Sequence, residues 1–135
     1  GKSIPFIENI SKAARLIGIA FQVRDDLLDY GVSKGNIGKP EMQDILEDKI
    51  TYPLYFALKY SNKKDSSKIL KKLKNKDFSI EEVADFVSSS NAFNKCNSLI
   101  QSYSNEISKC INKISNKEIR DEMLNLSESL KNRYE

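Results

Sequence analysis

Apolar residues recur at intervals of three and four along most of this 135-residue chain. That interval matches the 3.6-residue period of an α-helix, whereas a half-buried strand needs strict alternation of apolar and polar residues, which we do not find in the sequence. The first such stretch, from Ile4 to Asp29, carries Ile7, Ile10, Ala14, Ile17, Phe21 and Leu28. The pattern predicts an all-α protein that begins with one long helix.

The helical pattern breaks after Asp29. Residues 30–40 hold three glycines and a proline, a composition typical of a loop. A helical stretch follows over residues 44–60, and Pro53 within it fits best in a first helical turn, where its missing amide is not needed. The lysine-rich residues 63–76 predict a helix face in contact with solvent.

The last third of the chain has the most regular periodicity. Ser79 followed by Glu82 is the capping-box pattern that opens a helix. One long amphipathic helix is then marked by Phe93, Cys96, Leu99, Ile100, Tyr103, Ile107, Cys110, Ile111 and Ile114. A last helix carries Ile119, Met123, Leu126 and Leu130. We assign these apolar stripes to the core.

Composition excludes several classes of function. The sequence contains no histidine, which rules out Ser-His-Asp and Cys-His hydrolases and histidine-ligated zinc enzymes. The net charge of +3 is too small to predict nucleic-acid binding. The longest apolar stretch, Leu16 to Phe21, is too short for a transmembrane segment. Cys96 and Cys110 fall in one predicted helix, roughly 21 Å apart, and therefore cannot pair with each other. Free thiols indicate a reducing compartment, either the cytoplasm or an organelle.

Aspartates crowd the end of the first predicted helix. Gln22, Asp25 and Asp29 share one helix face, and Asp26 flanks it. The negative end of the helix dipole disfavours a further acid there by ~0.3–1 kcal/mol. We therefore expect a cation to compensate, and Mg²⁺ suits carboxylates that share it with water and phosphate. The spacing is equally compatible with a solvated acidic helix end paired with lysines.

Two lysines follow these aspartates. Lys39 comes directly after the glycine-rich loop, and Lys49 lies further along the chain. Carboxylates, a metal ion and lysines together describe a site for a diphosphate. The loop is not a P-loop, because Ser33 stands where the first glycine is required and Pro40 follows the lysine.

These residues resemble a known family in type and spacing. Gly18–Tyr30, Gly38–Pro40 and Asp44–Leu54 are similar to the second aspartate-rich region of the trans-isoprenyl diphosphate synthases, the polyprenyl synthetases. The family pattern is G-x-x-F-Q-x-x-D-D-x-x-D, a variable loop, G-K-P and D-L-x-E-G-K-x-T-x-P-L. This chain departs from it at Met42 and Asp48, which stand where the family has glycines.

The resemblance implies a fold and a reaction. The fold would be the C-terminal part of the isoprenoid-synthase-type bundle, in which helices surround a deep cavity. There an allylic diphosphate ionises with the help of Mg²⁺, and isopentenyl diphosphate adds to the resulting cation. Asp25 would ligate one magnesium, Asp29 would join it directly or through water, and Asp26 would support this shell.

The resemblance also implies how the substrate is held. Gln22 would lie beside the allylic substrate, and Lys39 and Lys49 would bind its diphosphate. The family's first aspartate-rich motif is absent from this sequence. We therefore expect residues 1–135 to form a single helical domain, the C-terminal fragment of a larger polyprenyl synthetase, without turnover on its own. We also expect it to form homo-oligomers or to pair with the missing N-terminal half.

Two alternatives remain open at this point. The chain could be a non-catalytic regulatory subunit of a heteromeric polyprenyl synthase. It could also be a plain helical interaction module whose acidic helix end binds no diphosphate.

Overall fold

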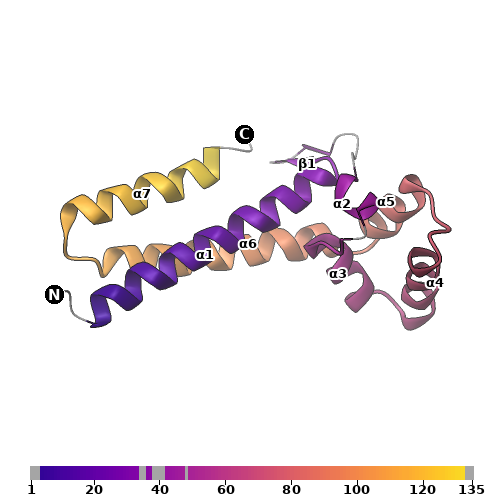
Figure 1. Cartoon of the computed structure of the whole chain (residues 1–135), viewed down its shortest axis with the longest axis horizontal. Coiled ribbons are helices and arrows are strands. Elements are labelled where there is room, and N and C mark those ends of the chain that lie inside the picture. Colours follow the sequence, from indigo (N-terminus) through magenta and orange to yellow (C-terminus); the bar gives the residue numbers. More distant parts are fainter. Residues whose placement is uncertain (1–3, 34–35, 38–41, 48, 133–135) are drawn as a thin grey trace. The chain divides into compact units, whose positions relative to one another are not determined.

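The computed structural model describes residues 4–33, 36–37, 42–47 and 49–132 (Figure 1). The structure is all-α, as predicted, apart from a two-residue antiparallel ladder in the predicted loop, where Val32 lies opposite Ile37. The elements in chain order are α1 (Ile4–Asp29), β1 (Val32–Ser33), β2 (Asn36–Ile37), α2 (Gln43–Leu46), α3 (Tyr52–Tyr60), α4 (Lys63–Lys74), α5 (Ile80–Ser89), α6 (Ala92–Asn112) and α7 (Lys117–Asn132).

The chain packs as two compact units. The first unit contains residues 1–24 and 98–135, and the second contains residues 25–97. The long helices α1 and α6 therefore contribute residues to both units.

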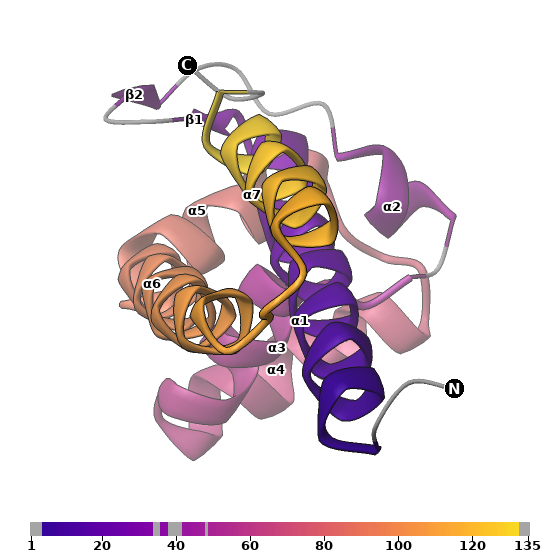
Figure 2. The same ribbon diagram turned by 90° about the vertical axis from the view of Figure 1, so that its left-hand side faces the viewer.

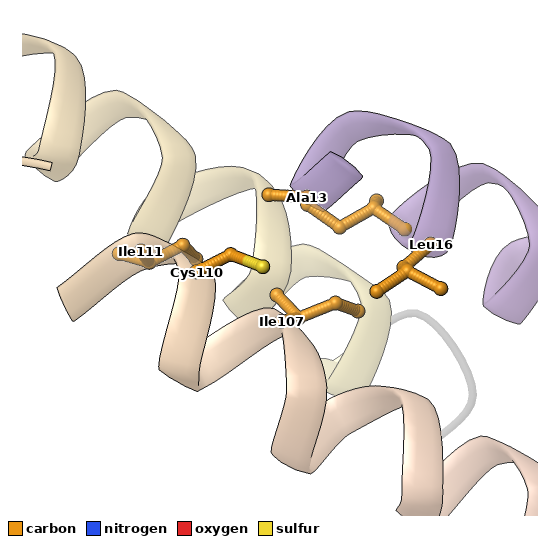
Figure 3. Close-up of a cluster of buried hydrophobic side chains, with 6 residues drawn as sticks. Ala13, Leu16, Ile107, Cys110 and Ile111 are labelled. Atoms are coloured by element: carbon orange, nitrogen blue, oxygen red, sulfur yellow. The ribbon is translucent and has the colours of Figure 1, made fainter. Parts of the chain in front are cut away.

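The first unit consists of three helical segments. Here α6 runs antiparallel to α1, and α7 turns back along them (Figures 1 and 2). Side chains from α1 and α6 form its core, which Figure 3 shows: Ala13, Leu16, Ile17, Ile107, Cys110 and Ile111. Met123 of α7 packs against this cluster, so all three segments share one apolar interior.

The buried face of α1 includes few of the apolar residues whose spacing predicted this helix. Its buried apolar residues are Ala13, Leu16, Ile17, Ala20, Val23 and Leu27. Of the apolar residues that indicated the helix, only Ile17 is among them, while Ile7 is 51% exposed and Leu28 is 38% exposed. The helix carries apolar residues on more than one face, so periodicity predicted the helix without identifying the side that is covered.

The second unit contains the short helices α2 to α5. Within it, α3 contacts both α4 and α5. Pro53 lies in the first turn of α3, as predicted. The predicted cap of α5 is also confirmed, because the Ser79 hydroxyl accepts a hydrogen bond of 3.0 Å from the amide of Glu82. The Glu82 carboxylate in turn pairs with Lys72 of α4.

Both cysteines lie in α6 and are buried as free thiols, as the predicted helix requires. Cys96 belongs to the second unit and Cys110 to the first. Burial raises the pKa of the Cys96 thiol to about 12. No helix in the described part of the chain has the length and apolar character needed to cross a membrane.

Candidate functional site

The end of α1 holds the three predicted metal ligands in the second unit. Asp25 and Asp29 are half-buried there, whereas Asp26 is only 2% exposed. Gln22 lies three residues before Asp25 on the same helix and is exposed. The structure thus separates one aspartate, which is enclosed by protein, from two that retain contact with solvent.

Asp29 joins the end of α1 to the start of α2. Its carboxylate accepts hydrogen bonds from the backbone amides of Gln43, at 2.9 Å, and Asp44, at 3.3 Å. Its backbone carbonyl accepts a third, of 3.0 Å, from the amide of Met42. These amide dipoles place partial positive charge beside an acid that the end of α1 disfavours. The first-turn amides of α2 therefore supply part of the compensation for which we expected a cation.

Asp26 joins the end of α1 to the start of α3. Its carboxylate accepts a hydrogen bond of 3.0 Å from the backbone amide of Tyr52, the first residue of α3. Beside it, the buried Tyr30 side chain is hydrogen-bonded to Thr51, and burial raises the pKa of Tyr30. Burial is the main cause of the raised pKa of the Cys96 thiol, and the negative charge of Asp26 is the second cause. Asp26 therefore lies between the end of α1 and the start of α3, within electrostatic reach of Cys96 on α6.

Met42 replaces a glycine of the family pattern, and its backbone shows why glycine suits that position. Its φ of 56° and ψ of 36° are left-handed, a conformation that costs a residue with a side chain ~1–2 kcal/mol. The Met42 side chain is nevertheless 0% exposed. Methionine at position 42 thus keeps the left-handed backbone turn that leads into α2 and adds a buried side chain.

Of the two predicted diphosphate-binding lysines, Lys39 lies outside the described residues. Lys49 is described, between α2 and α3, with its side chain 63% exposed. Its ammonium group lies 3.0 Å from the Glu47 carboxylate, and this hydrogen bond raises the pKa of Lys49. The amide of Lys49 donates to the carbonyl of Asp44, one of the two residues whose amides bind Asp29.

Lys49 also lines a cavity of about 750 Å³ in the second unit. The rest of the lining is mainly apolar, with further lysines at positions 71, 74 and 76. Among the described residues, this lining does not include the three aspartates. Within the residues that the structure describes, no three acidic or cysteine side chains are grouped so that they could hold a metal ion. We call the stretch from Gln43 to Tyr52, which carries Lys49, the Lys49 segment. Hydrogen bonds link Asp26 and Asp29 to this segment, but the aspartates are not among the described residues that line its cavity.

Sequence reasoning missed the donors that bind Asp26 and Asp29. The amides of Tyr52 and Gln43 carry no residue-type signal, because every residue except proline offers the same group. The available signal was Thr51-Tyr52-Pro53, since proline in a first turn places a helix start, with its unbonded amides, at this position.

Comparison with known proteins identifies a matching family and several similar sequences. The sequence profile described as polyprenyl synthetase matches residues 2–90. Large subunit 1 of the heterodimeric geranylgeranyl pyrophosphate synthase of Arabidopsis thaliana, named as chloroplastic, is 44% identical over 61 residues, which are 45% of this chain and 16% of that protein. The chloroplastic geranylgeranyl pyrophosphate synthase of Catharanthus roseus is 47% identical over 47 residues, which are 35% of this chain and 13% of that protein.

One solved structure has the same fold. The apo form of an Arabidopsis medium/long-chain length prenyl pyrophosphate synthase matches with a TM-score of 0.80 at 19% identity. The match covers 100% of this chain and 46% of that one. The predicted relation to a helical prenyl synthase bundle is therefore confirmed at the level of the fold, and this chain spans less than half of that relative.

Proposed function

This chain belongs to the polyprenyl synthetase family, and from that premise we propose that it supplies the second aspartate-rich half of a prenyltransferase site. The proposed reaction is the Mg²⁺-dependent condensation of isopentenyl diphosphate with an allylic diphosphate. The observation that carries the proposal is the attachment of the Lys49 segment to the acidic end of α1. Asp29 binds the amides of Gln43 and Asp44, and Asp44 in turn accepts the amide of Lys49.

The residues at this helix end fit Mg²⁺. That ion takes oxygen ligands, usually one or two carboxylates, and keeps several waters beside substrate phosphates. Asp25 and Asp29 are half-buried carboxylates and so remain accessible to a hydrated ion. They are the residues that would hold it, and the bound ion would neutralise charge on the diphosphate.

The remaining proposed site residues act on the substrate. Lys39 and Lys49 bind the diphosphate, and their positive charge stabilises it as the carbon–oxygen bond breaks and negative charge moves onto the leaving group. Gln22 lies beside the allylic substrate. The double bond of isopentenyl diphosphate then adds to the allylic cation, and the cation formed by this addition loses a proton to give the new double bond.

We expect no turnover from this chain without a partner. It spans 46% of the solved relative and carries no first aspartate-rich motif. The complementary half-site would come from the N-terminal half of a polyprenyl synthetase, because another copy of this chain would lack the same motif. A non-catalytic regulatory subunit of a heteromeric synthase is the second candidate, since two relatives are named as subunits of a heterodimeric enzyme. An organelle is part of the proposal because the relatives are named as chloroplastic.

The test is a titration with Mg²⁺ and a bisphosphonate, followed by thermal shift. We expect each ligand to raise the melting temperature only in the presence of the other. Asp25→Ala and Lys39→Ala should abolish this mutual dependence, whereas Glu81→Ala, which removes an exposed acid on α5 of the same unit, should preserve it. An equal response in Asp25→Ala and the unmodified chain would refute the proposed site.

A second assay separates the two candidate functions. The chain is mixed with a polyprenyl synthetase N-terminal half that carries the first aspartate-rich motif, and condensation of the two diphosphates is measured. Turnover that is lost with Asp25→Ala supports the half-site. Turnover that is independent of Asp25 supports the regulatory subunit instead.

A further inference from the structure

Asp26 differs from its two neighbouring aspartates in its access to solvent. Its side chain is 2% exposed, while Asp25 and Asp29 are half-buried. A magnesium ion dehydrates reluctantly, so its carboxylate ligands must face space that also holds water or phosphate. The enclosed carboxylate of Asp26 is poorly placed for that role.

The position of Asp26 suits a different task. The first amides of a helix have no partner within the helix, and Tyr52 is the first residue of α3. Asp26 accepts the hydrogen bond of this amide at 3.0 Å and brings negative charge to the positive end of the α3 dipole. The side chain of Thr51, the residue that would ordinarily cap this helix, is hydrogen-bonded to Tyr30. The cap of α3 therefore comes from α1, 26 residues earlier in the chain.

This cap holds one end of the Lys49 segment, and Asp29 holds the other. Asp29 attaches one end of the segment to α1 through the amides of Gln43 and Asp44. Asp26 attaches the other end through Tyr52, three residues after Lys49. Two aspartates in one helical turn thus hold both ends of the segment that carries the lysine.

We propose that Asp26 is a positioning residue that caps α3 and fixes the Lys49 segment at the acidic end of α1, and that it does not ligate the metal. The inference rests on the proposed function in assigning Asp25 and Lys49 to the diphosphate. The neighbouring residues Asp25 and Asp26 then differ in the chemical property that each position requires. Position 26 needs a hydrogen-bond acceptor, which asparagine also offers, whereas position 25 needs a negative charge.

The experiment compares Asp26→Asn, Asp26→Ala and Asp25→Asn in the 135-residue chain. Two quantities are measured: hydrogen exchange of the Tyr52 amide by NMR without metal, and Mg²⁺-dependent binding of inorganic diphosphate by calorimetry. In Asp26→Ala the Tyr52 amide should exchange on the order of tenfold faster, and diphosphate binding should weaken. Asp26→Asn should restore both quantities to within about threefold of the unmodified chain, because asparagine and aspartate cap helices about equally well. Asp25→Asn should weaken diphosphate binding by about tenfold or more and leave Tyr52 exchange unchanged.

The opposite pattern would overturn the inference. If Asp26→Asn weakens diphosphate binding as much as Asp25→Asn does while the Tyr52 amide stays protected, Asp26 is a metal ligand. If Asp26→Ala fails to fold while Asp26→Asn folds, the need for an acceptor is supported. If the unmodified chain binds no diphosphate with Mg²⁺, the proposed function fails for the chain alone. The exchange of the Tyr52 amide then decides the role of Asp26 by itself, and an unchanged rate in both Asp26 variants refutes it.

Discussion

Replacing Met42 by glycine should destabilise the chain, although its φ of 56° favours glycine. The left-handed strain that glycine relieves is ~1–2 kcal/mol. The Met42 side chain, however, is 0% exposed, and truncating a buried methionine costs roughly 2–5 kcal/mol. Glycine adds roughly 0.5–1 kcal/mol of backbone entropy to that loss. The loss exceeds the gain, so the free energy of unfolding should fall by about 0.5–5 kcal/mol.

Lys76 offers the matched control for this substitution. Its φ is 54°, almost that of Met42, but it lies exposed at the end of α4, so glycine there relieves strain without emptying a buried site. Lys76→Gly should raise the free energy of unfolding by about 0.5–1 kcal/mol. Urea unfolding followed by far-UV circular dichroism measures both variants. If Met42→Gly stabilised the chain as Lys76→Gly does, the buried methionine would contribute nothing and the reasoning would be refuted.

Two further predictions concern the cores of the two units. Ile107 is 0% exposed, so Ile107→Ala should lower the free energy of unfolding by roughly 2–5 kcal/mol. Ile7 is 51% exposed, so Ile7→Ala should change it by about 0.5 kcal/mol or less. Equal effects of the two variants in urea unfolding would contradict the packing of the first unit. Burial raises the pKa of Tyr30 above the ordinary 10.0, so the folded chain keeps a proton that the unfolded chain releases. The contribution of Tyr30 to the free energy of unfolding should therefore be fully present below about pH 10 and should be lost as the pH rises further. In Tyr30→Phe the free energy of unfolding should fall less steeply with pH. Identical alkaline profiles of the two proteins would count against this.

Local signals made most of the helices predictable from the sequence. The predicted helix Ile4–Asp29 coincides with α1, because periodicity within it and the glycine-rich composition after it act over a few residues. The Ser79 cap and the place of Pro53 were predictable for the same reason. The assignment of Leu126 on α7 to the core was wrong, since this side chain is 45% exposed. The side that a helix buries depends on its tertiary partners.

The candidate site shows the same limit. The sequence placed Asp25, Asp26 and Asp29 together at a helix end, and the family pattern suggested their chemistry. Their amide partners lie much further along the chain, 14 residues from Asp29 to Gln43 and 26 from Asp26 to Tyr52. A motif that lists three equivalent acids does not reveal that one of them is enclosed, since enclosure is produced by helices that are distant in sequence.

The positions of the two thiols give this chain a pair of built-in chemical reporters. Cys96 and Cys110 belong to different units, and each is nearly inaccessible in the folded state, at 0% and 3% exposure. An alkylating reagent can reach either one only when the surrounding unit opens. Because the two modified peptides differ in mass, a single labelling experiment would time the opening of each unit separately, without any engineered probe. Loss of folding in one half of the molecule would thus be distinguishable from loss of folding in the whole.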